Sequence, residues 1–276
     1  MSRRRRRSRS AGRDAVPSGD VMLVRTTPAP TTVGAGDPGD DPILAVPPAP
    51  RAAVTTRRGR RGTVTTAPGT RRFLVLACGT EDVPAIDLAT GAVARLRVVW
   101  TAGRPPDLSP FDVVDAAIAT DPERDDLAQP EAITVHGIPE VAGAMHGRRA
   151  RTLLRKLLAP TDGHLLGFPG SSWPYWEFHG MRPSVALVAP TRGPIVFRRR
   201  ADDSVWTRFG WPRSDIWLPV EDRRVIAALW AARRDRLAGK DLTRALGFRP
   251  HYLVVTVSRP RQGHCYKTVA AFLPRP

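Results

Sequence analysis

The chain has 276 residues, of which 42% are hydrophobic and 25% are charged, and its formal net charge is +17. This length suffices for one large folded domain or two small ones, each with its own hydrophobic core. No apolar run approaches the roughly 18 residues of a membrane-spanning helix, and the basic start is not followed by the apolar segment of an export signal. We therefore expect a cytoplasmic protein with no membrane partner.

The sequence carries none of the patterns that indicate a cofactor, a metal or a catalytic centre. No glycine-rich phosphate-binding loop follows a strand-like run, and the six histidines are too scattered for a metal site. Cys78 and Cys265 lie in apolar runs, as buried free thiols do. A nucleophile at Cys265 is disfavoured because the neighbouring His264 points to the opposite face of a strand. The sequence predicts no cofactor and favours a protein that is not an enzyme.

The positive charge comes almost entirely from arginine and is unevenly distributed. Only three of the 43 basic residues are lysines. Arginine prefers phosphate and carboxylate partners because its planar group donates several hydrogen bonds at once, although a GC-rich genome also encodes an excess of arginine. The net charge is +10 for residues 1–72, −8 for residues 73–144 and +15 for residues 145–276. We expect these segments to be a tail and two subdomains, with 73–276 as one folded body as the alternative.

Residues 1–72 are rich in arginine, proline, glycine and threonine and contain hardly any aromatic side chain. Such a composition cannot bury enough apolar surface to offset the entropy of ordering, so we expect a disordered basic tail. The run RRGRRG at 57–62 resembles the glycine-spaced basic tracts of flexible RNA-binding tails. The alternative is that translation starts at Met22 and that the arginine run before it is not part of the protein.

The acidic segment is typical of a series of short strands. Residues 73–78 are a continuous apolar run of strand length, and 85–100 predicts two strands joined at a Thr90–Gly91 turn. Two further strands are expected at 111–119 and 132–137. The charged, proline-bounded connector between these two predicts a surface loop.

Residues 147–160 show the clearest amphipathic pattern of the chain. Successive helical residues are about 100° apart, which divides this segment into an apolar and a basic arc. Pro160 ends the helix. The apolar arc comprises Ala150, Leu153, Leu154, Leu157 and Leu158. The basic arc comprises Arg148, Arg149, Arg151, Arg155 and Lys156.

Strands predominate in the rest of the chain, and short turns between several of them favour antiparallel pairing. The expected strands are 164–168, 184–190, 194–200, 204–211 and 215–220. A second amphipathic helix is expected at 222–239, with Asp222 as its N-cap and Gly239 as its stop.

The chain ends in an expected hairpin at 251–274, whose turn at 260–263 places Cys265 opposite Ser258. Runs of strands with two helices between them predict an α+β fold. We expect a mainly antiparallel sheet, for which a barrel-like form is one arrangement, two amphipathic helices and the disordered basic tail.

The stretch GFPGSSWPYWEF at 167–178 gathers five aromatic residues around two prolines. Each proline favours an extended residue before it, here Phe168 and Trp173. Two interpretations follow: a rigid corner that fills the core, which we favour, or a platform on which Tyr175 or Trp176 stacks with a ligand. Glu177 is expected to pair with an arginine such as Arg182.

The basic arc is the stronger candidate site because five clustered cations repel one another unless water or phosphates solvate them. Our hypothesis is a nucleic-acid-associated accessory protein that binds phosphates through this arc and its tail, whether DNA or RNA. One alternative is a small enzyme with a pocket near Trp173, Glu177 and His179. Another is a module that docks an acidic protein. The plainer interpretation of the arc is a solvated face, or one paired with the acidic segment. The residues assigned to nucleic-acid binding are Arg148, Arg149, Arg151, Arg155, Lys156, Tyr175 and Trp176.

Overall fold

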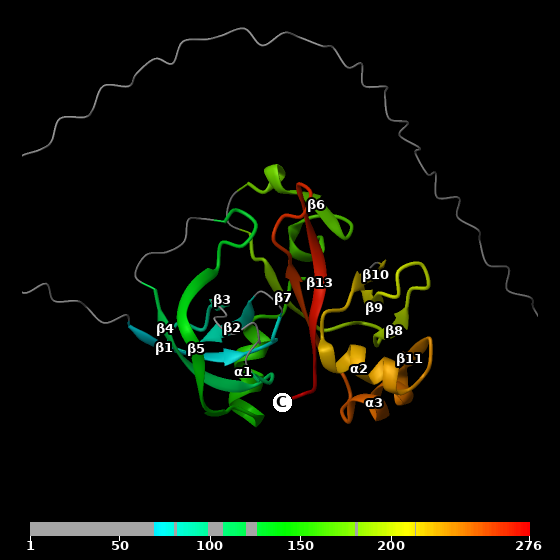
Figure 1. Ribbon diagram of the computed structural model, residues 1–276, viewed down its shortest axis with the longest axis horizontal. Helices are drawn as coiled ribbons and strands as arrows, with labels where there is room; N and C mark the ends of the chain where they lie inside the picture. Colours follow the sequence, from blue (N-terminus) through cyan, green and yellow to red (C-terminus); the bar gives the residue numbers. More distant parts are fainter. Residues whose placement is uncertain (1–68, 80–81, 99–106, 120–125, 180–181, 213) are drawn as a thin grey trace, which may run out of the picture. The chain divides into compact units, whose positions relative to one another are not determined.

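A computed structural model of the chain describes residues 69–79, 82–98, 107–119, 126–179, 182–212 and 214–276 (Figure 1). These residues lie in one compact unit. The first 68 residues of the expected tail lie outside the described residues. Its last three residues, 70–72, belong to the first strand, so the folded region begins earlier than residue 73. The division at residue 144 into two subdomains stays a prediction.

The elements follow one another in a mainly β order. They are β1 (Thr70–Val75), β2 (Val83–Asp87), β3 (Val93–Val98), β4 (Asp112–Ile118), β5 (Ala132–Ala144), α1 (Gly147–Lys156), η1 (Leu165–Gly167), β6 (Ser172–Pro174), η2 (Tyr175–Glu177), β7 (Val185–Val188), β8 (Ile195–Arg198), β9 (Val205–Trp211), β10 (Ser214–Pro219), α2 (Arg223–Ala231), β11 (Arg236–Ala238), α3 (Gly239–Leu246), β12 (Tyr252–Val257) and β13 (His264–Leu273).

The first five strands close into a barrel with the strand order β1-β2-β3-β5-β4. Neighbouring strands are antiparallel, except that β3 and β5 run parallel. Alternate residues point inward, as the two-residue period of a strand requires, and Phe73, Leu96 and Val114 are fully buried in the interior. A barrel-like sheet is therefore present, but it comprises only these five strands.

The remaining strands form two four-stranded antiparallel sheets, ordered β6-β13-β12-β7 and β10-β9-β8-β11. Figure 1 shows β13 in red, the long strand that pairs with both β12 and β6. The structure is thus α+β and mostly antiparallel. It contains three helices among the described residues, one more than the sequence predicted.

The predicted helix at 222–239 is shorter than expected. Asp222 is its N-cap, as predicted, and its carboxylate accepts the backbone N–H of Arg224 at 3.0 Å. The helix ends at Ala231, and Arg233 adopts a left-handed conformation with φ of 49°. Leu237, in β11, then pairs with Val196 of β8, so its conformation depends on a partner that is remote in sequence. Gly239 begins α3 rather than ending α2.

Two further expectations need correction. Leu166 has φ of 57°, which breaks the predicted strand at 164–168 into the short 3-10 turn η1. The terminal hairpin turns at Gln262 and Gly263, both with positive φ, and this tighter turn changes the register. Ser258 consequently bonds to Tyr266 through the backbone, while Cys265 pairs with residue 173 of β6.

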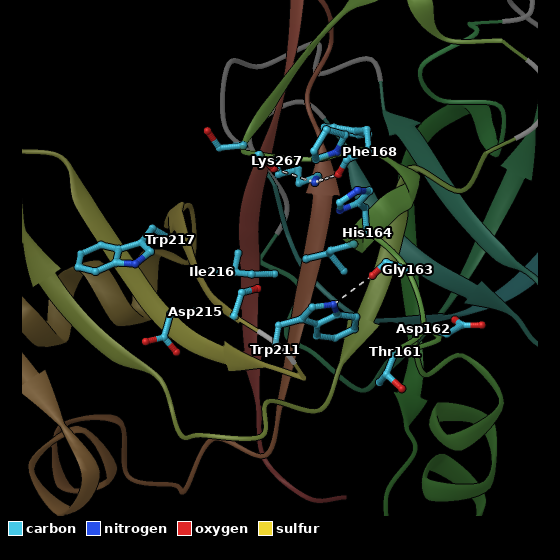
Figure 2. A pocket seen from close by; sticks show the side chains of 15 residues that line it. Thr161, Asp162, Gly163, His164, Phe168, Trp211, Asp215, Ile216, Trp217 and Lys267 are labelled. Carbon is cyan, nitrogen blue, oxygen red and sulfur yellow. Dashed lines mark hydrogen bonds between the residues drawn. The ribbon is translucent and has the colours of Figure 1, made fainter. Parts of the chain in front are cut away.

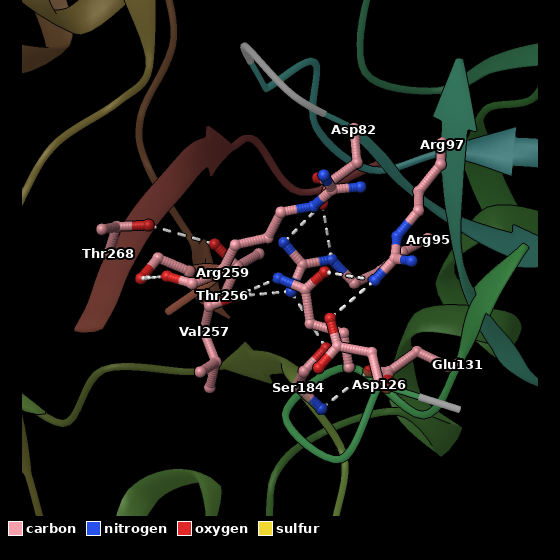
Figure 3. Close-up of polar contacts among 12 residues, drawn as sticks. Asp82, Arg95, Arg97, Asp126, Glu131, Ser184, Thr256, Val257, Arg259 and Thr268 are labelled. Carbon is pink, nitrogen blue, oxygen red and sulfur yellow. Dashed lines mark hydrogen bonds and ion pairs between the residues drawn. The ribbon is translucent and has the colours of Figure 1, made fainter. Parts of the chain in front are cut away.

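A buried polar cluster joins the outer face of β3 to strand β12 and to Ser184, which lies just before β7 (Figure 3). The Arg95 guanidinium bonds to the Asp82 carboxylate at 2.8 Å, to the Ser184 hydroxyl at 3.0 Å and to the Val257 carbonyl at 2.6 Å. Arg97 beside it bonds to a carboxylate oxygen of Asp126 at 2.8 Å. Because these partners come from well-separated parts of the chain, the cluster fixes the barrel against the C-terminal sheets.

No helix within the described part of the chain is long and apolar enough to span a bilayer. The compartment in which the protein works stays a prediction.

Candidate nucleic-acid interface

Helix α1 is anchored by its apolar arc. Ala150 and Leu154 have no exposed surface, and Leu154 belongs to an apolar cluster with Leu187 and Val254. Leu158 was expected on the same arc, but it is 36% exposed. The helix ends at Lys156, and Leu158 instead forms an isolated β-bridge with Leu187.

The basic arc of α1 faces solvent, with one exception. Arg148, Arg149, Arg155 and Lys156 are exposed, whereas Arg151 is half-buried. The Arg151 guanidinium donates a hydrogen bond to the carbonyl oxygen of Pro276 at 3.1 Å. Four of the five predicted cations are thus free to meet an external partner, and the fifth holds the C-terminal residues.

The cations of α1 form no ion pair with any described residue. Many arginines elsewhere in the described chain do pair with aspartates. These are Arg71, Arg72, Arg95, Arg97, Arg192, Arg198, Arg199, Arg200, Arg208, Arg224, Arg234 and Arg244. The alternative in which α1 pairs with the acidic segment has no ion pair to support it within the described ranges. The paired aspartates of that segment instead bind Arg71, Arg72, Arg95 and Arg97.

The dipole of α1 acts differently at its two ends: the first turn attracts anions, and the last turn stabilises the cations that lie there. No acidic residue lies in the first turn, and the N-cap residue His146 forms no side-chain cap. The free backbone N–H groups there carry partial positive charge, so Arg148 and Arg149 add to a field that attracts phosphate. Arg155 and Lys156 lie in the last turn, where the helix dipole stabilises cations.

A shallow groove of about 460 Å³ runs beside the first turn of the helix. Leu88, Met145 and Leu153 provide apolar surface along it, and Arg148 and Arg149 border it. A partner with both apolar and phosphate groups would fit this combination.

The barrel offers no comparable surface on β2 and β3. A five-stranded barrel is also the core of the OB-fold, which binds oligonucleotides on the face of its second and third strands. Here every residue of β2 is buried, and the outward-pointing Arg95 and Arg97 are enclosed in the polar cluster. This face of β2 and β3 is therefore buried against the rest of the protein and is not accessible to a ligand.

The aromatic stretch at 167–178 is mainly a structural corner, as favoured. Phe168 is 1% exposed, and its ring centroid lies 5.9 Å from that of Trp173 and 5.6 Å from that of Phe178. Tyr175 is half-buried against the core. Trp176 is 63% exposed and contacts the His264 ring edge-to-face, so one ring face of the stretch is accessible.

The side chains of the alternative enzyme pocket do not enclose a site. Glu177 and His179 are exposed, while Trp173 is half-buried in β6. Among the described residues Glu177 has no ion pair, and Arg182 donates to the Gly167 carbonyl instead. That pocket stays a prediction.

A cavity of about 680 Å³ does lie beside the stretch, but neither Glu177 nor His179 lines it (Figure 2). Its walls include Phe168, Trp211 and Lys267. The Lys267 ammonium donates to the carbonyl oxygens of Phe168 at 2.6 Å and Gly170 at 2.8 Å, and burial lowers its pKa to about 8. No sequence pattern singled out Lys267 as a buried residue, although it occupies an apolar strand where a lysine is unusual.

A second group of side chains was also missed: the aromatic and basic residues on the outer face of the β10-β9-β8-β11 sheet. Trp206 and Arg208 alternate with buried residues along β9, and Trp217 is exposed on β10. The alternation is visible in the sequence of each strand, but the neighbours across the sheet depend on register.

No protein-family model and no curated protein matches this chain. Among solved structures, it is similar to the crystal structure of the p204 HINb domain, with 11% sequence identity and a TM-score of 0.29, over 74% of this chain and 97% of that one. This TM-score is too low to show a common fold.

Proposed function

We propose that the protein is a nucleic-acid-associated accessory protein whose helix α1 binds phosphate groups. The observation that carries this proposal is the lack of any described carboxylate partner for the exposed Arg148, Arg149, Arg155 and Lys156. From Val141 to Pro160 the chain contains no acidic residue at all.

Nucleic acid supplies the dense negative charge that such a face lacks. Each phosphate neutralised by a cation releases counterions, which makes binding favourable and salt-dependent. Arg148 and Arg155 are seven positions apart, or about 10 Å along the helix axis. We therefore expect two or three phosphates to be contacted at once, without base specificity. Trp176 remains the residue of the aromatic stretch whose ring is accessible for stacking.

The salt dependence of binding by the full chain tests the proposal. Each phosphate contact contributes about −0.9 for duplex DNA, or −0.7 for a single strand, to the slope of log affinity against log salt. Arg148→Glu combined with Arg155→Glu should flatten the slope by about two and weaken all sequences alike.

Lys240→Glu combined with Arg244→Glu is the matched control, because it makes the same change in net charge on the exposed surface of α3. An equal loss of affinity with both double variants would show general electrostatic attraction rather than a site on α1. If the wild-type chain binds neither DNA nor RNA at low salt, the proposal is wrong, and an acidic protein becomes the partner to test.

A further inference from the structure

Among the described residues, helices α2 and α3 cover one face of the β10-β9-β8-β11 sheet. Val196, Phe209 and Leu218 point to the same side of the sheet and are buried. They share one apolar cluster with Val225 of α2 and Leu242 of α3. The two helices thus back this face, and alternate residues of every strand must point to the opposite one.

The register places aromatic and basic side chains together on the opposite face. Phe197 of β8 pairs with Trp206 of β9 on one side and with Arg236 of β11 on the other. One step along the sheet, Arg208 of β9 pairs with Trp217 of β10. We call these five residues, Phe197, Trp206, Arg208, Trp217 and Arg236, the aromatic–arginine face.

The rings of this face are held in fixed positions. The centroids of Phe197 and Trp217 lie 5.4 Å apart with an interplanar angle of 74°. The Arg208 guanidinium carbon lies 5.4 Å from the Trp217 centroid, and that of Arg199 lies 5.0 Å from the Trp206 ring. The Trp206 indole N–H donates to the Ser204 hydroxyl at 2.7 Å. Little rotational freedom would be lost if a ligand stacked here.

The rings are also accessible. Trp217 is 49% exposed, and Phe197 and Trp206 are half-buried. In Figure 2 the Trp217 ring points away from Ile216, because neighbouring side chains of a strand point to opposite faces of the sheet. Exposed apolar surface that polar residues surround is typical of an interaction site.

Charge favours an anionic occupant. Arg192 and Arg208 both approach one carboxylate, that of Asp215, at 2.6 and 3.7 Å. Arg236 is exposed and has no ion pair within the described part of the chain. The cations around the rings therefore outnumber their carboxylate partner, whereas Asp202 is neutralised by its own pairing with Arg199.

We propose that the aromatic–arginine face binds single-stranded nucleic acid, with unpaired bases stacked on Trp217 and Trp206. Arg208 and Arg236 contact the adjacent phosphates. In a duplex the faces of the bases are already stacked on one another, so rings on a protein sheet can reach only unpaired bases. The inference rests on the proposed function and adds the strand state that the protein recognises.

Binding of labelled oligonucleotides by the full chain tests this inference. The probes are oligothymidylate, oligouridylate and a mixed-sequence duplex, each of about 20 residues, which exceeds the roughly 4–16 nucleotides that single-strand-binding folds occupy. Stacking on one aromatic side chain contributes roughly 1–3 kcal/mol, so Trp217→Ala should weaken single-strand binding about five- to 150-fold. Trp217→Phe keeps a ring and should retain most of the affinity.

Trp230→Ala is the matched control, since Trp230 is 46% exposed and also lies beneath an arginine but belongs to α2. It should leave binding unchanged, and duplex binding should be unaffected by Trp217→Ala. The two single-stranded probes separate DNA from RNA as the source of the unpaired bases. Melting temperatures of the variants check that each is folded.

The outcomes separate this inference from the role of α1. The inference is overturned if single-strand binding survives Trp217→Ala or if Trp230→Ala causes an equal loss of affinity. If affinity falls only with Arg148→Glu combined with Arg155→Glu, the proposed function of α1 still stands. Tight duplex binding that Trp217→Ala weakens equally also overturns it. If no probe binds the wild-type chain, both proposals are wrong.

Discussion

Lys267 illustrates how a single residue can meet conflicting demands. It is 2% exposed on β13, yet its ammonium has two carbonyl acceptors and lies 3.9 Å from the centroid of the Phe168 ring. The side chain therefore ties the aromatic corner to the central strand. Removing it from water disfavours the charged form, which is why its pKa falls to about 8 from the ordinary 10.5.

This lowered pKa makes stability depend on pH. Below pH 8 both the folded and the unfolded chain carry the charge, and the full cost of burial is present. Between about pH 8 and 10.5 the unfolded state binds more protons at this site, so the free energy of unfolding gains a contribution that rises with pH. Lys267→Met removes that contribution.

Urea unfolding between pH 7 and pH 10 measures this contribution. The free energy of unfolding of the wild type minus that of Lys267→Met should become more positive as pH rises. The same substitution at the exposed Lys240 should give a difference that stays flat. A flat difference for Lys267→Met as well would show that its ammonium is solvated.

Helix α1 shows how one element combines anchoring and binding. Its ten residues are too few for stability in isolation, so packing of Ala150 and Leu154 must hold it in place. That anchoring orients the basic arc outward, and the two arcs respond differently to mutation.

Leu154→Asp should therefore unfold α1 and lower the stability of the protein by several kcal/mol, because it buries an unpaired charge. Arg155→Glu changes an exposed residue and should cost about 1 kcal/mol or less, mainly through the dipole at the helix end. Thermal melting compares the two. Similar losses would mean that the helix presents a different face to the core.

At the scale of the whole molecule, a buried polar cluster joins the barrel to the C-terminal sheets. Arg95 is 4% exposed and has partners at residues 82, 184 and 257. Buried ion pairs of this kind contribute little net stability compared with apolar packing, but losing one partner leaves the other charge stranded.

Arg95→Met should accordingly lower the free energy of unfolding by about 3–5 kcal/mol. Arg72→Met breaks a solvent-exposed pair with Asp115 in the same barrel and should cost about 1 kcal/mol or less. Denaturant titration of both variants gives the comparison. If Arg95→Met is as mild as Arg72→Met, water must reach Asp82 when the arginine is gone.

Local patterns in the sequence were enough to locate α1, the N-cap Asp222 and several strands. An amphipathic helix or an alternating strand is encoded within about a dozen residues, so its period can be read directly. The basic arc followed from that period, and the exposure of four of its five cations agrees with it. The same reasoning identified the aromatic corner around Phe168, because proline restricts the backbone within two residues.

Only the tertiary structure decided how these elements combine. Closure of β1–β5 into a barrel, the end of α2 at Ala231 and the pairing of β11 with β8 all depend on contacts between distant residues. The aromatic–arginine face exists because register aligns β8, β9, β10 and β11, and a shift by one residue would turn its rings inward. The sequence by itself therefore determined where α1, the start of α2 and several strands lie and where charge collects. The cross-strand neighbours were left to folding, because strand pairing is nonlocal whereas hydrophobic periodicity is local.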